Sequence, residues 1–245
     1  MNKKSNIIYG IHPVLEALRS GSHFERVFLQ KNFKGHSHKE LMMELNKFNV
    51  PVSKVPIERI HKFTQNNHQG VVALASPIQY HTLNQLVPNL FEQGVNPLIL
   101  MLDEVTDVRN FGAIGRTAEC LGVHGIVIPT RGGAQVNEDA VNTSAGALHH
   151  LPVCREGNLL ETTKYLKESG FNVVACSEKS NQHLKDMNFS LPTLLIVGSE
   201  ENGVSSSLLE IADGVAKVKM EGKIESLNVS VATGMALYEV RRQRN

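Results

Sequence analysis

The sequence predicts an α/β protein built from two parts: a largely parallel, helix-covered sheet over residues 97–245 and a small α/β module over residues 1–76. Three observations predict this organisation. From Pro97 onward, short apolar runs without polar alternation are separated by helical stretches, and strands buried on both faces require such runs. Before residue 77, short helices and strands follow one another. The length of 245 residues suits one large or two modest domains.

The first module begins with a short helix. Val14, Leu15 and Leu18 recur at helical spacing, and Gly21 is suited to end the helix because glycine readily adopts the left-handed conformation found there. Residues 77–96 contain proline and glycine breaks and a weak apolar pattern, so we expect a linker that carries one helix. Between these segments, the pattern predicts strands over 26–30, 50–55 and 70–75 and helices over 38–48 and 58–63.

The second part follows an alternating rhythm of strand and helix. In such parallel sheets, ligands bind beyond the carboxyl ends of the strands, so chemistry is expected there. The apolar runs predict strands over 98–102, 125–129, 172–177, 193–198 and 214–220; the helical stretches cover 113–121, 138–147, 159–168 and 205–212, with a last helix within 223–240.

Composition excludes several classes of protein. A hydrophobic content of 41% with 20% charged residues is typical of globular domains. No stretch approaches the roughly 20 apolar residues of a membrane span, and the amino terminus lacks a secretory apolar core, so we expect a cytoplasmic protein. Cys120, Cys154 and Cys176 lie far apart in apolar runs, which indicates buried reduced thiols. His36 and His38, two residues apart, do not share a helical face, so no metal site is expected.

Charge is distributed unevenly along the chain. Residues 1–80 contain eleven Lys or Arg and five Asp or Glu, whereas the remainder contains fourteen and nineteen. The first part is therefore basic although the whole chain has a net charge of +1. Such asymmetry is found in proteins that bind polyanions, and it is also found in ordinary solvated surfaces. Charge alone does not decide between these interpretations.

Polar residues collect in three loops that follow predicted strands. In the first loop, Asn110 and Arg116 flank glycines at 112 and 115, which we expect to form the turn that opens a helix. None of the glycine patterns is GxGxxG or a phosphate-binding GK[ST], so dinucleotide and P-loop sites are disfavoured. The three loops are DEVTDVRNFGAIGRTAE (103–119), VGSEENGVSSS (197–207) and MEGKIESLNVS (220–230).

Each of these polar residues also has a purely structural interpretation. Arg116 could pair with Glu119 one helical turn away, and Asn228 could cap the last helix. Glu200 and Ser205 could be turn and capping residues. Their joint position at the ends of predicted strands, with glycines on either side, favours a shared site.

The same three loops resemble known motifs. NFGAIGRTAE, VGSEENGVS and ESLNVSVATGMALYE, in this order, resemble the three motifs of the SpoU (TrmH) family of RNA ribose 2′-O-methyltransferases. IYGIHPVLEAL with the QGVVALA strand resembles the amino-terminal substrate-binding domain of that family. The layout is similar to that of the members that methylate a guanosine of 23S rRNA, and relatives with this layout modify other RNAs, including tRNA.

The resemblance implies a homodimer that binds RNA and S-adenosyl-L-methionine, with no metal and with the carboxyl-terminal segment threaded into a deep trefoil knot. The family motif commonly has proline where this chain has Lys219, so the cofactor loop is expected to be less rigid here. By the resemblance, Gly198, Val218 and Leu227 would bind the cofactor, and Asn110, Arg116, Glu200, Ser226 and Asn228 would form the active site.

Methyl transfer from a sulfonium to a ribose oxygen needs positioning and exclusion of water more than a metal or a covalent intermediate. A guanidinium stays protonated, so we expect Arg116 to act electrostatically and not as a base. Two other classes of function compete. A non-catalytic RNA-binding protein of ribosome assembly could share the fold, and a nucleotide-dependent oxidoreductase is disfavoured by the missing glycine fingerprint.

Overall fold

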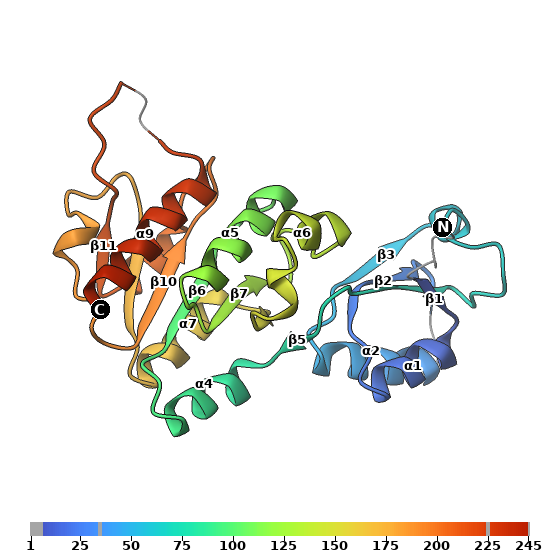
Figure 1. Ribbon diagram of the computed structural model, residues 1–245. Helices are drawn as coiled ribbons and strands as arrows, with labels where there is room; N and C mark the ends of the chain where they lie inside the picture. Colours follow the sequence, from blue (N-terminus) through green and yellow to red (C-terminus); the bar gives the residue numbers. More distant parts are fainter. Residues whose placement is uncertain (1–6, 34–35, 224–225, 245) are drawn as a thin grey trace. The chain divides into compact units, whose positions relative to one another are not determined.

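The computed structural model describes residues 7–33, 36–223 and 226–244 (Figure 1). The chain divides into two compact units whose boundary lies between Gln79 and Tyr80. Ile224 and Glu225, within the third polar loop, lie outside the described residues, as does the amino-terminal segment before Ile7.

The described residues of the first unit form a four-stranded sheet in the order β1-β4-β2-β3. Strand β3 is parallel to β2, and β4 is antiparallel to both β1 and β2. Helices α1 and α2 bury their apolar side chains against one face of this sheet, and the shorter α3 packs on the other. The elements are β1 (Ile7–Tyr9), α1 (Ile11–Arg19), β2 (Phe24–Gln30), α2 (His36–Lys47), β3 (Val52–Val55), α3 (Ile57–His61) and β4 (Val71–Ala75).

The described residues of the second unit form a seven-stranded sheet in the order β11-β9-β10-β6-β7-β8-β5, in which every pairing is parallel. The predicted parallel sheet is thus confirmed. Its elements are β5 (Tyr80–His81), α4 (Leu83–Glu92), β6 (Leu98–Leu102), α5 (Val108–Cys120), β7 (Gly125–Pro129), α6 (Glu138–Thr143), η1 (Ala147–His149), β8 (Val153–Glu156), α7 (Leu159–Glu168), β9 (Asn172–Cys176), η2 (Leu184–Asp186), β10 (Thr193–Val197), α8 (Ser206–Ile211), β11 (Gly214–Ala216) and α9 (Val229–Arg244).

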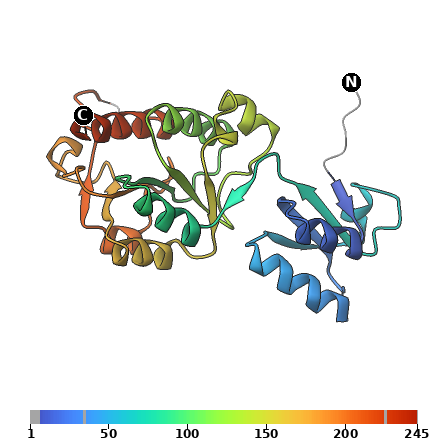
Figure 2. The ribbon, with the colours of Figure 1, turned by 60° about the horizontal axis from the view of Figure 1, so that its bottom comes forward.

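Helices cover both faces of this sheet. Figure 2 shows α5 and α9 on one face and α4 and α7 on the other. Apolar side chains of α4, α7 and α8 pack with those of the central strands in one core cluster. Strands β6 and β10 are fully buried, which explains their continuous apolar sequences.

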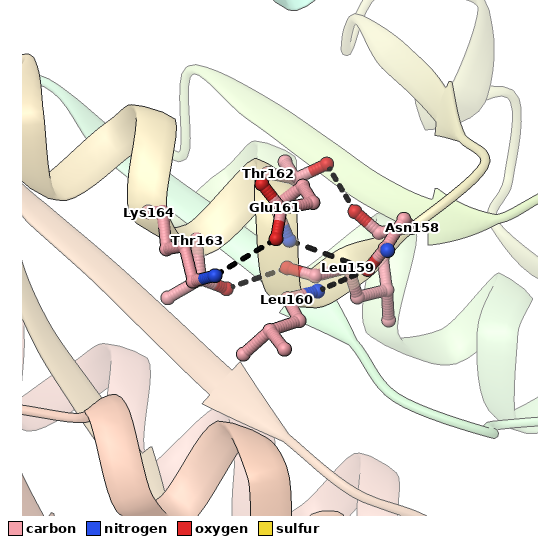
Figure 3. A network of polar contacts seen from close by, with 7 residues as sticks. All are labelled: Asn158, Leu159, Leu160, Glu161, Thr162, Thr163 and Lys164. Carbon is pink, nitrogen blue, oxygen red and sulfur yellow. Dashed lines mark hydrogen bonds and ion pairs between the residues drawn. The ribbon is translucent and has the colours of Figure 1, made fainter.

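Helix α7 begins where the pattern predicts because Asn158 caps it. The Asn158 Oδ1 atom accepts hydrogen bonds from the backbone nitrogens of Leu160 (3.0 Å) and Glu161 (3.3 Å), as Figure 3 shows. These backbone donors have no partner within the helix itself. One turn later, Lys164 Nζ lies 2.8 Å from Glu161 Oε1. Local sequence therefore fixes the start of this helix.

The segment expected to be a linker over residues 77–96 is instead largely part of the second unit. Its Tyr80–His81 strand pairs with β8, and Leu83, Val87 and Leu90 of α4 are buried. The expected helix is present, but it belongs to the core. A linker was predicted because Pro88, which lies within α4, interrupts the helical pattern in the sequence.

Two glycines expected to form a turn lie inside helix α5. A Cβ atom at Gly112 would lie 2.7 Å from the Ala140 carbonyl oxygen, and one at Gly115 would lie 2.8 Å from Leu148 Cδ2. These glycines therefore let α6 and η1 pack closely against α5. Helix α5 begins five residues earlier than predicted, at Val108, because Asp107 caps it.

The prediction of three buried thiols was wrong for Cys120, which is exposed near the end of α5. Cys154 is buried, and Cys176 is partly buried. Within the described ranges, no helix is long and apolar enough to cross a membrane. The same residues contain no group of three or more His, Cys, Asp or Glu side chains that could hold a metal ion.

Candidate active site

Two polar side chains from distant parts of the chain, those of Asn110 and Asn228, meet at the Glu200 carboxylate. The Glu200 Oε1 atom accepts hydrogen bonds from Asn110 Nδ2 at 3.2 Å, from Asn228 Nδ2 at 2.6 Å and from the backbone nitrogen of Val229 at 3.1 Å. Asn228 Nδ2 also donates to Asn110 Oδ1 at 3.0 Å. We call Asn110, Glu200 and Asn228 the polar triad. One residue from each of the three polar loops thus enters a single hydrogen-bonded group.

Helix ends position two members of the polar triad. Asn110 lies in the first turn of α5, and its backbone nitrogen donates a 2.7 Å hydrogen bond to the capping side chain of Asp107. Asn228 precedes α9, and its Oδ1 atom accepts a 3.0 Å hydrogen bond from the backbone nitrogen of Ser230. Asn228 therefore has both roles at once. Its side-chain oxygen caps α9, and its side-chain nitrogen contacts the other two members of the polar triad.

Glu200 is held by a tight loop after β10. Ser199 and Gly203 exchange two backbone hydrogen bonds, of 3.2 and 3.0 Å, across the base of this loop. Gly198 makes the closure possible, because a Cβ atom there would overlap the carbonyl group of Gly203 and the backbone nitrogen of Val204. The loop therefore needs glycine at position 198 for close backbone approach.

A cavity opens beside the polar triad, at the carboxyl ends of the neighbouring strands β10, β9 and β11. This is the place where a parallel sheet is expected to bind ligands. Five residues named from the sequence line it: Gly198, Glu200, Val218, Ser226 and Leu227. The other lining residues are Cys176, Ser177, Glu178, Val197, Ser199, Gly203, Lys217, Met220, Val229 and Ala232.

Arg116 does not join this group within the chain. It lies six residues after Asn110 on α5, which turns its side chain by about 120° from that of Asn110 around the helix axis. Thr117, which faces α9, and Ala118, which is buried, occupy the neighbouring faces. Arg116 is exposed, and among the described residues it forms no ion pair, so the pair with Glu119 that the spacing allows is not made.

Sequence reasoning missed the wall of the cavity supplied by β9 and by the start of the segment after β11. Cys176 and Ser177 end the predicted strand over 172–177 and Glu178 follows it, and this position at the carboxyl end of a strand was the available signal. Lys217 places a cation in the same lining as the Glu178 carboxylate. Burial of the sulfur raises the pKa of the Cys176 thiol to about 12, so this thiol is neutral at pH 7.

A second, apolar cavity of about 520 Å³ lies on the other side of α9. Val231, Met235 and Tyr238 of α9 line it and are exposed by 51%, 46% and 64%. Lys217 and Val218 line both cavities. Helix α9 therefore presents Val229 and Ala232 to the first cavity and an exposed apolar stripe to the second.

The residues around the first cavity can orient a ligand by hydrogen bonds from amides, hydroxyls and backbone groups. Their carboxylates, Glu178 and Glu200, can accept hydrogen bonds from a ligand or from other side chains. Apolar walls at Val197, Val218 and Leu227 can exclude water from it. This arrangement suits a reaction that depends on positioning.

Comparisons with known families agree with this architecture. The model of the SpoU rRNA Methylase family matches residues 97–238, and that of the RNA 2'-O ribose methyltransferase substrate binding domain matches residues 7–81. A Bacillus subtilis protein assigned by name to the TrmH family of tRNA/rRNA methyltransferases is 33% identical over 245 residues, covering 100% of this chain and 98% of its own length.

Solved structures show the same fold. A TrmH/SpoU tRNA modifying enzyme of A. aeolicus is 33% identical, with a TM-score of 0.56 and coverage of 66% of this chain and 84% of that one. An AdoMet-bound rRNA methyltransferase of Sinorhizobium meliloti is 24% identical, with a TM-score of 0.62 and coverage of 96% and 86%. At that identity, the second likeness concerns the fold alone.

Proposed function

Because the chain belongs to the SpoU rRNA Methylase family, we propose that it transfers a methyl group from S-adenosyl-L-methionine to a ribose 2′-oxygen of RNA. The observation that carries the proposal is the polar triad beside a cavity at the carboxyl ends of β10, β9 and β11. Parallel sheets bind ligands at this edge, and methyl transfer needs a site built for positioning.

The residues of the cavity suit the proposed cofactor. Backbone groups at Gly198, Val218 and Leu227 would meet the adenosine part, and the apolar side chains of Val218 and Leu227 would cover it. Glu178 and Lys217 offer opposite charges to the ammonium, carboxylate and hydroxyl groups of such a ligand. The bound cofactor would supply an electrophilic methyl group on a sulfonium.

The polar triad would keep the site in shape for the reaction. Glu200 ties the start of α9 to the start of α5, because it accepts hydrogen bonds from Asn110, Asn228 and Val229. Ser226, which lines the cavity, would contribute a hydroxyl near the reacting sugar. Fixed positions of these groups lower the entropic cost of bringing the 2′-oxygen and the methyl group together.

Arg116 would bind RNA that lies over the exposed face of α5. A guanidinium can contact a phosphate through two parallel hydrogen bonds and can stabilise charge that develops on the 2′-oxygen while staying protonated. Arg116→Ala should slow methyl transfer by about 10²–10³-fold, as expected for the loss of one electrostatic stabiliser. Arg116→Lys should retain measurable turnover in a single-turnover assay, and complete loss with unchanged RNA and cofactor binding would oppose this role.

The proposed substrate is a guanosine of 23S ribosomal RNA. Support comes from the order and spacing of the three motifs and the substrate-binding domain, which resemble those of the 23S rRNA guanosine 2′-O-methyltransferase RlmB. A tRNA substrate is the alternative within the family. Incubation with labelled methyl donor and with rRNA or tRNA from a strain that lacks the protein, followed by mapping of the methylated nucleotide, distinguishes the two. Either substrate would place the enzyme in the cytoplasm.

A non-catalytic role in RNA binding or ribosome assembly is tested separately. Calorimetry with S-adenosyl-L-methionine should show binding of the cofactor at one site per chain. A protein that binds RNA but neither binds this cofactor nor transfers its methyl group would be a binding protein with an inherited fold.

We also propose that two copies of the chain pair through α9 and that the segment after β11 is threaded as a trefoil knot. The exposed apolar stripe of Val231, Met235 and Tyr238 supports the pairing, since single domains rarely expose such patches without a partner. Sedimentation should give a dimer, and Met235→Glu with Tyr238→Glu should give a folded monomer. The hydrogen bond of Asn228, which follows this segment, to Glu200 in the loop after β10 supports the proposed threading.

A further inference from the structure

The second face of the sheet in the first unit is only partly covered. Helices α1 and α2 pack on the first face, but the second is covered by the five-residue helix α3 and the residues that follow it. Ile7, Tyr9 and Leu74 on this face remain half-buried. A sheet in a small α/β unit thus keeps an open surface beside α3.

Aromatic rings and an arginine are stacked at this surface. The ring centroids of Phe28 and Phe63 are 4.7 Å apart with an interplanar angle of 30°. The Arg59 guanidinium carbon lies 5.9 Å from the centroid of the Phe28 ring, and Arg59 is exposed. The Tyr9 hydroxyl accepts a 2.8 Å hydrogen bond from Asn66 Nδ2, which orients the tyrosine ring at the edge of the same face. The Phe28 ring is itself buried, so the planar groups that remain for a base to stack on are those of Tyr9, Phe63 and Arg59.

The cations on this face also lack carboxylate partners. Among the described residues Arg59, Lys62 and Arg26 form no ion pair, although Glu58 lies nearby on α3. Arg26 donates from Nη1 to Ser53 Oγ at 3.2 Å, while its buried Nε has no hydrogen-bond partner.

The helical face of the same unit differs. There, Arg19 lies 2.6 Å from the Glu40 carboxylate and 3.6 Å from that of Glu16. The positive charge that the sequence concentrates in this unit is therefore partly neutralised on the face of α1 and α2 and is left unpaired on the open face. Unpaired cations beside stacked rings complement a phosphate backbone that carries exposed bases.

We propose that this open sheet face binds unpaired nucleotides of the RNA substrate, with bases stacked on the planar groups and phosphates held by the cations. The inference rests on the proposed function and names the substrate surface of the first unit. Unpaired RNA is favoured over duplex because paired bases are stacked on one another and cannot reach the rings. The open sheet face consists of Tyr9, Arg26, Arg59, Lys62 and Phe63.

Two double variants of the full chain test the proposal. Arg59→Ala with Lys62→Ala removes two cations from the open sheet face, and Lys39→Ala with Lys47→Ala removes two exposed cations from α2. The probes are a short fluorescent oligouridylate and a blunt RNA duplex of equal length, followed by fluorescence anisotropy. The first variant should bind the single strand about tenfold more weakly or worse, since one lost stacking contact alone is worth about that factor. The α2 variant should change affinity by less than about threefold.

Salt dependence gives a second readout. The slope of log affinity against log salt should become shallower by about 1.4 in the Arg59 and Lys62 variant, which is 0.7 for each lost phosphate contact on a single strand. Arg59→Lys keeps the charge but loses the planar stacking group, so it should weaken binding with little change in slope. Melting curves show whether each variant is folded, and the Arg59→Lys comparison decides the matter if the double variant unfolds.

Equal affinity of the two double variants for the single strand, or tighter binding of the duplex than of the single strand, would overturn this inference. The proposed methyltransferase function would stand in that case. Conversely, a wild-type protein that fails to bind S-adenosyl-L-methionine in calorimetry refutes the proposed function, while the anisotropy comparison still decides whether the open sheet face binds RNA.

Discussion

The side-chain nitrogen of Asn228 donates a 2.6 Å hydrogen bond to Glu200, a residue 28 positions earlier in the chain. The same Glu200 oxygen accepts the backbone nitrogen of Val229 at 3.1 Å, so a single carboxylate holds the entrance of α9. The position of the last helix beside the cavity therefore depends on Glu200.

Replacement of Glu200 should loosen the entrance of α9. Glu200→Ala removes three hydrogen bonds at a site exposed to solvent, so we expect a loss of about 1–2 kcal/mol in the free energy of unfolding. Glu200→Gln keeps an acceptor oxygen and should cost less. Urea denaturation measures both, with Glu201→Ala at the neighbouring exposed position as control. Equal stability of the Glu200→Ala and Glu201→Ala proteins would contradict the holding role of this carboxylate.

Gly198→Ala should damage the loop that carries Glu200. The added methyl group would overlap the backbone of Gly203 and Val204, and backbone overlap cannot be relieved by a rotamer change. We expect a loss of about 3 kcal/mol in the free energy of unfolding and weaker binding of S-adenosyl-L-methionine in calorimetry. Gly157→Ala is the matched control, because a Cβ atom there has no neighbour within 4 Å. Equal free energies of unfolding for the Gly198→Ala and Gly157→Ala proteins would show that the loop can rearrange to accept the methyl group.

Arg244 should anchor the end of α9. Its guanidinium donates hydrogen bonds to the carbonyl oxygens of Phe189 (2.8 Å), Asn96 (2.8 Å) and Leu191 (2.7 Å), among others. Arg244→Ala would leave these acceptors unpaired and should lower the free energy of unfolding by about 2–3 kcal/mol in urea denaturation. Arg241→Ala removes the same charge from an exposed position three residues earlier and should have little effect. A similar loss in both variants would assign the effect to charge.

His124 should make stability depend on pH. Burial and the nearby Arg244 charge hold the pKa of His124 below its ordinary value of 6.5, and its Nδ1 accepts a 3.0 Å hydrogen bond from the backbone nitrogen of Leu98. As pH falls below about 6.5, the unfolded chain binds a proton that the folded chain does not, so the free energy of unfolding decreases. This decrease continues until pH reaches the lower pKa of the folded state.

Melting temperatures between pH 7 and pH 5 test this dependence. His124→Asn keeps an acceptor for Leu98 but cannot titrate, so its melting temperature should fall less with pH than that of the wild type. His149→Asn, at an exposed position, should keep the slope of the wild type. A wild-type slope in the His124→Asn protein would rule out this histidine as the cause.

Local patterns predicted much of the second unit. Helix α7 spans Leu159–Glu168 as its periodicity predicts, because Asn158 supplies a cap within the same few residues. The fully buried strands β6 and β10 were also predicted, from their continuous apolar sequences. Strands β5 and β8 were missed. Strand β8 has the sequence VCRE and contains a buried arginine, Arg155. The Arg155 guanidinium lies 3.8 Å from the centroid of the Tyr80 ring. This contact with a distant residue cannot be predicted from a local pattern.

The candidate site was predicted unevenly. The three polar loops were found from residue type and position, and the resemblance named the residues within them. The different directions of Arg116, which faces solvent, and Asn110, which contacts Glu200, were not predicted, because the predicted helix began after Asn110 and the two residues were not placed on one helix. Glu178 and Lys217 were missed, since they join the cavity only through the neighbouring strands β9 and β11.

The sequence by itself determined most of the helices and strands of the second unit and which loops carry polar groups, because periodicity, caps and glycines act over a few residues. Only the tertiary structure decided that Asn110, Glu200 and Asn228 share hydrogen bonds, that Cys120 is exposed, and that Gly112 and Gly115 serve helix packing. Such relationships depend on the strand order β11-β9-β10-β6 and on the packing of helices over it. Strand order is set by the free energy of burying all the apolar faces together, and no local segment contains that sum.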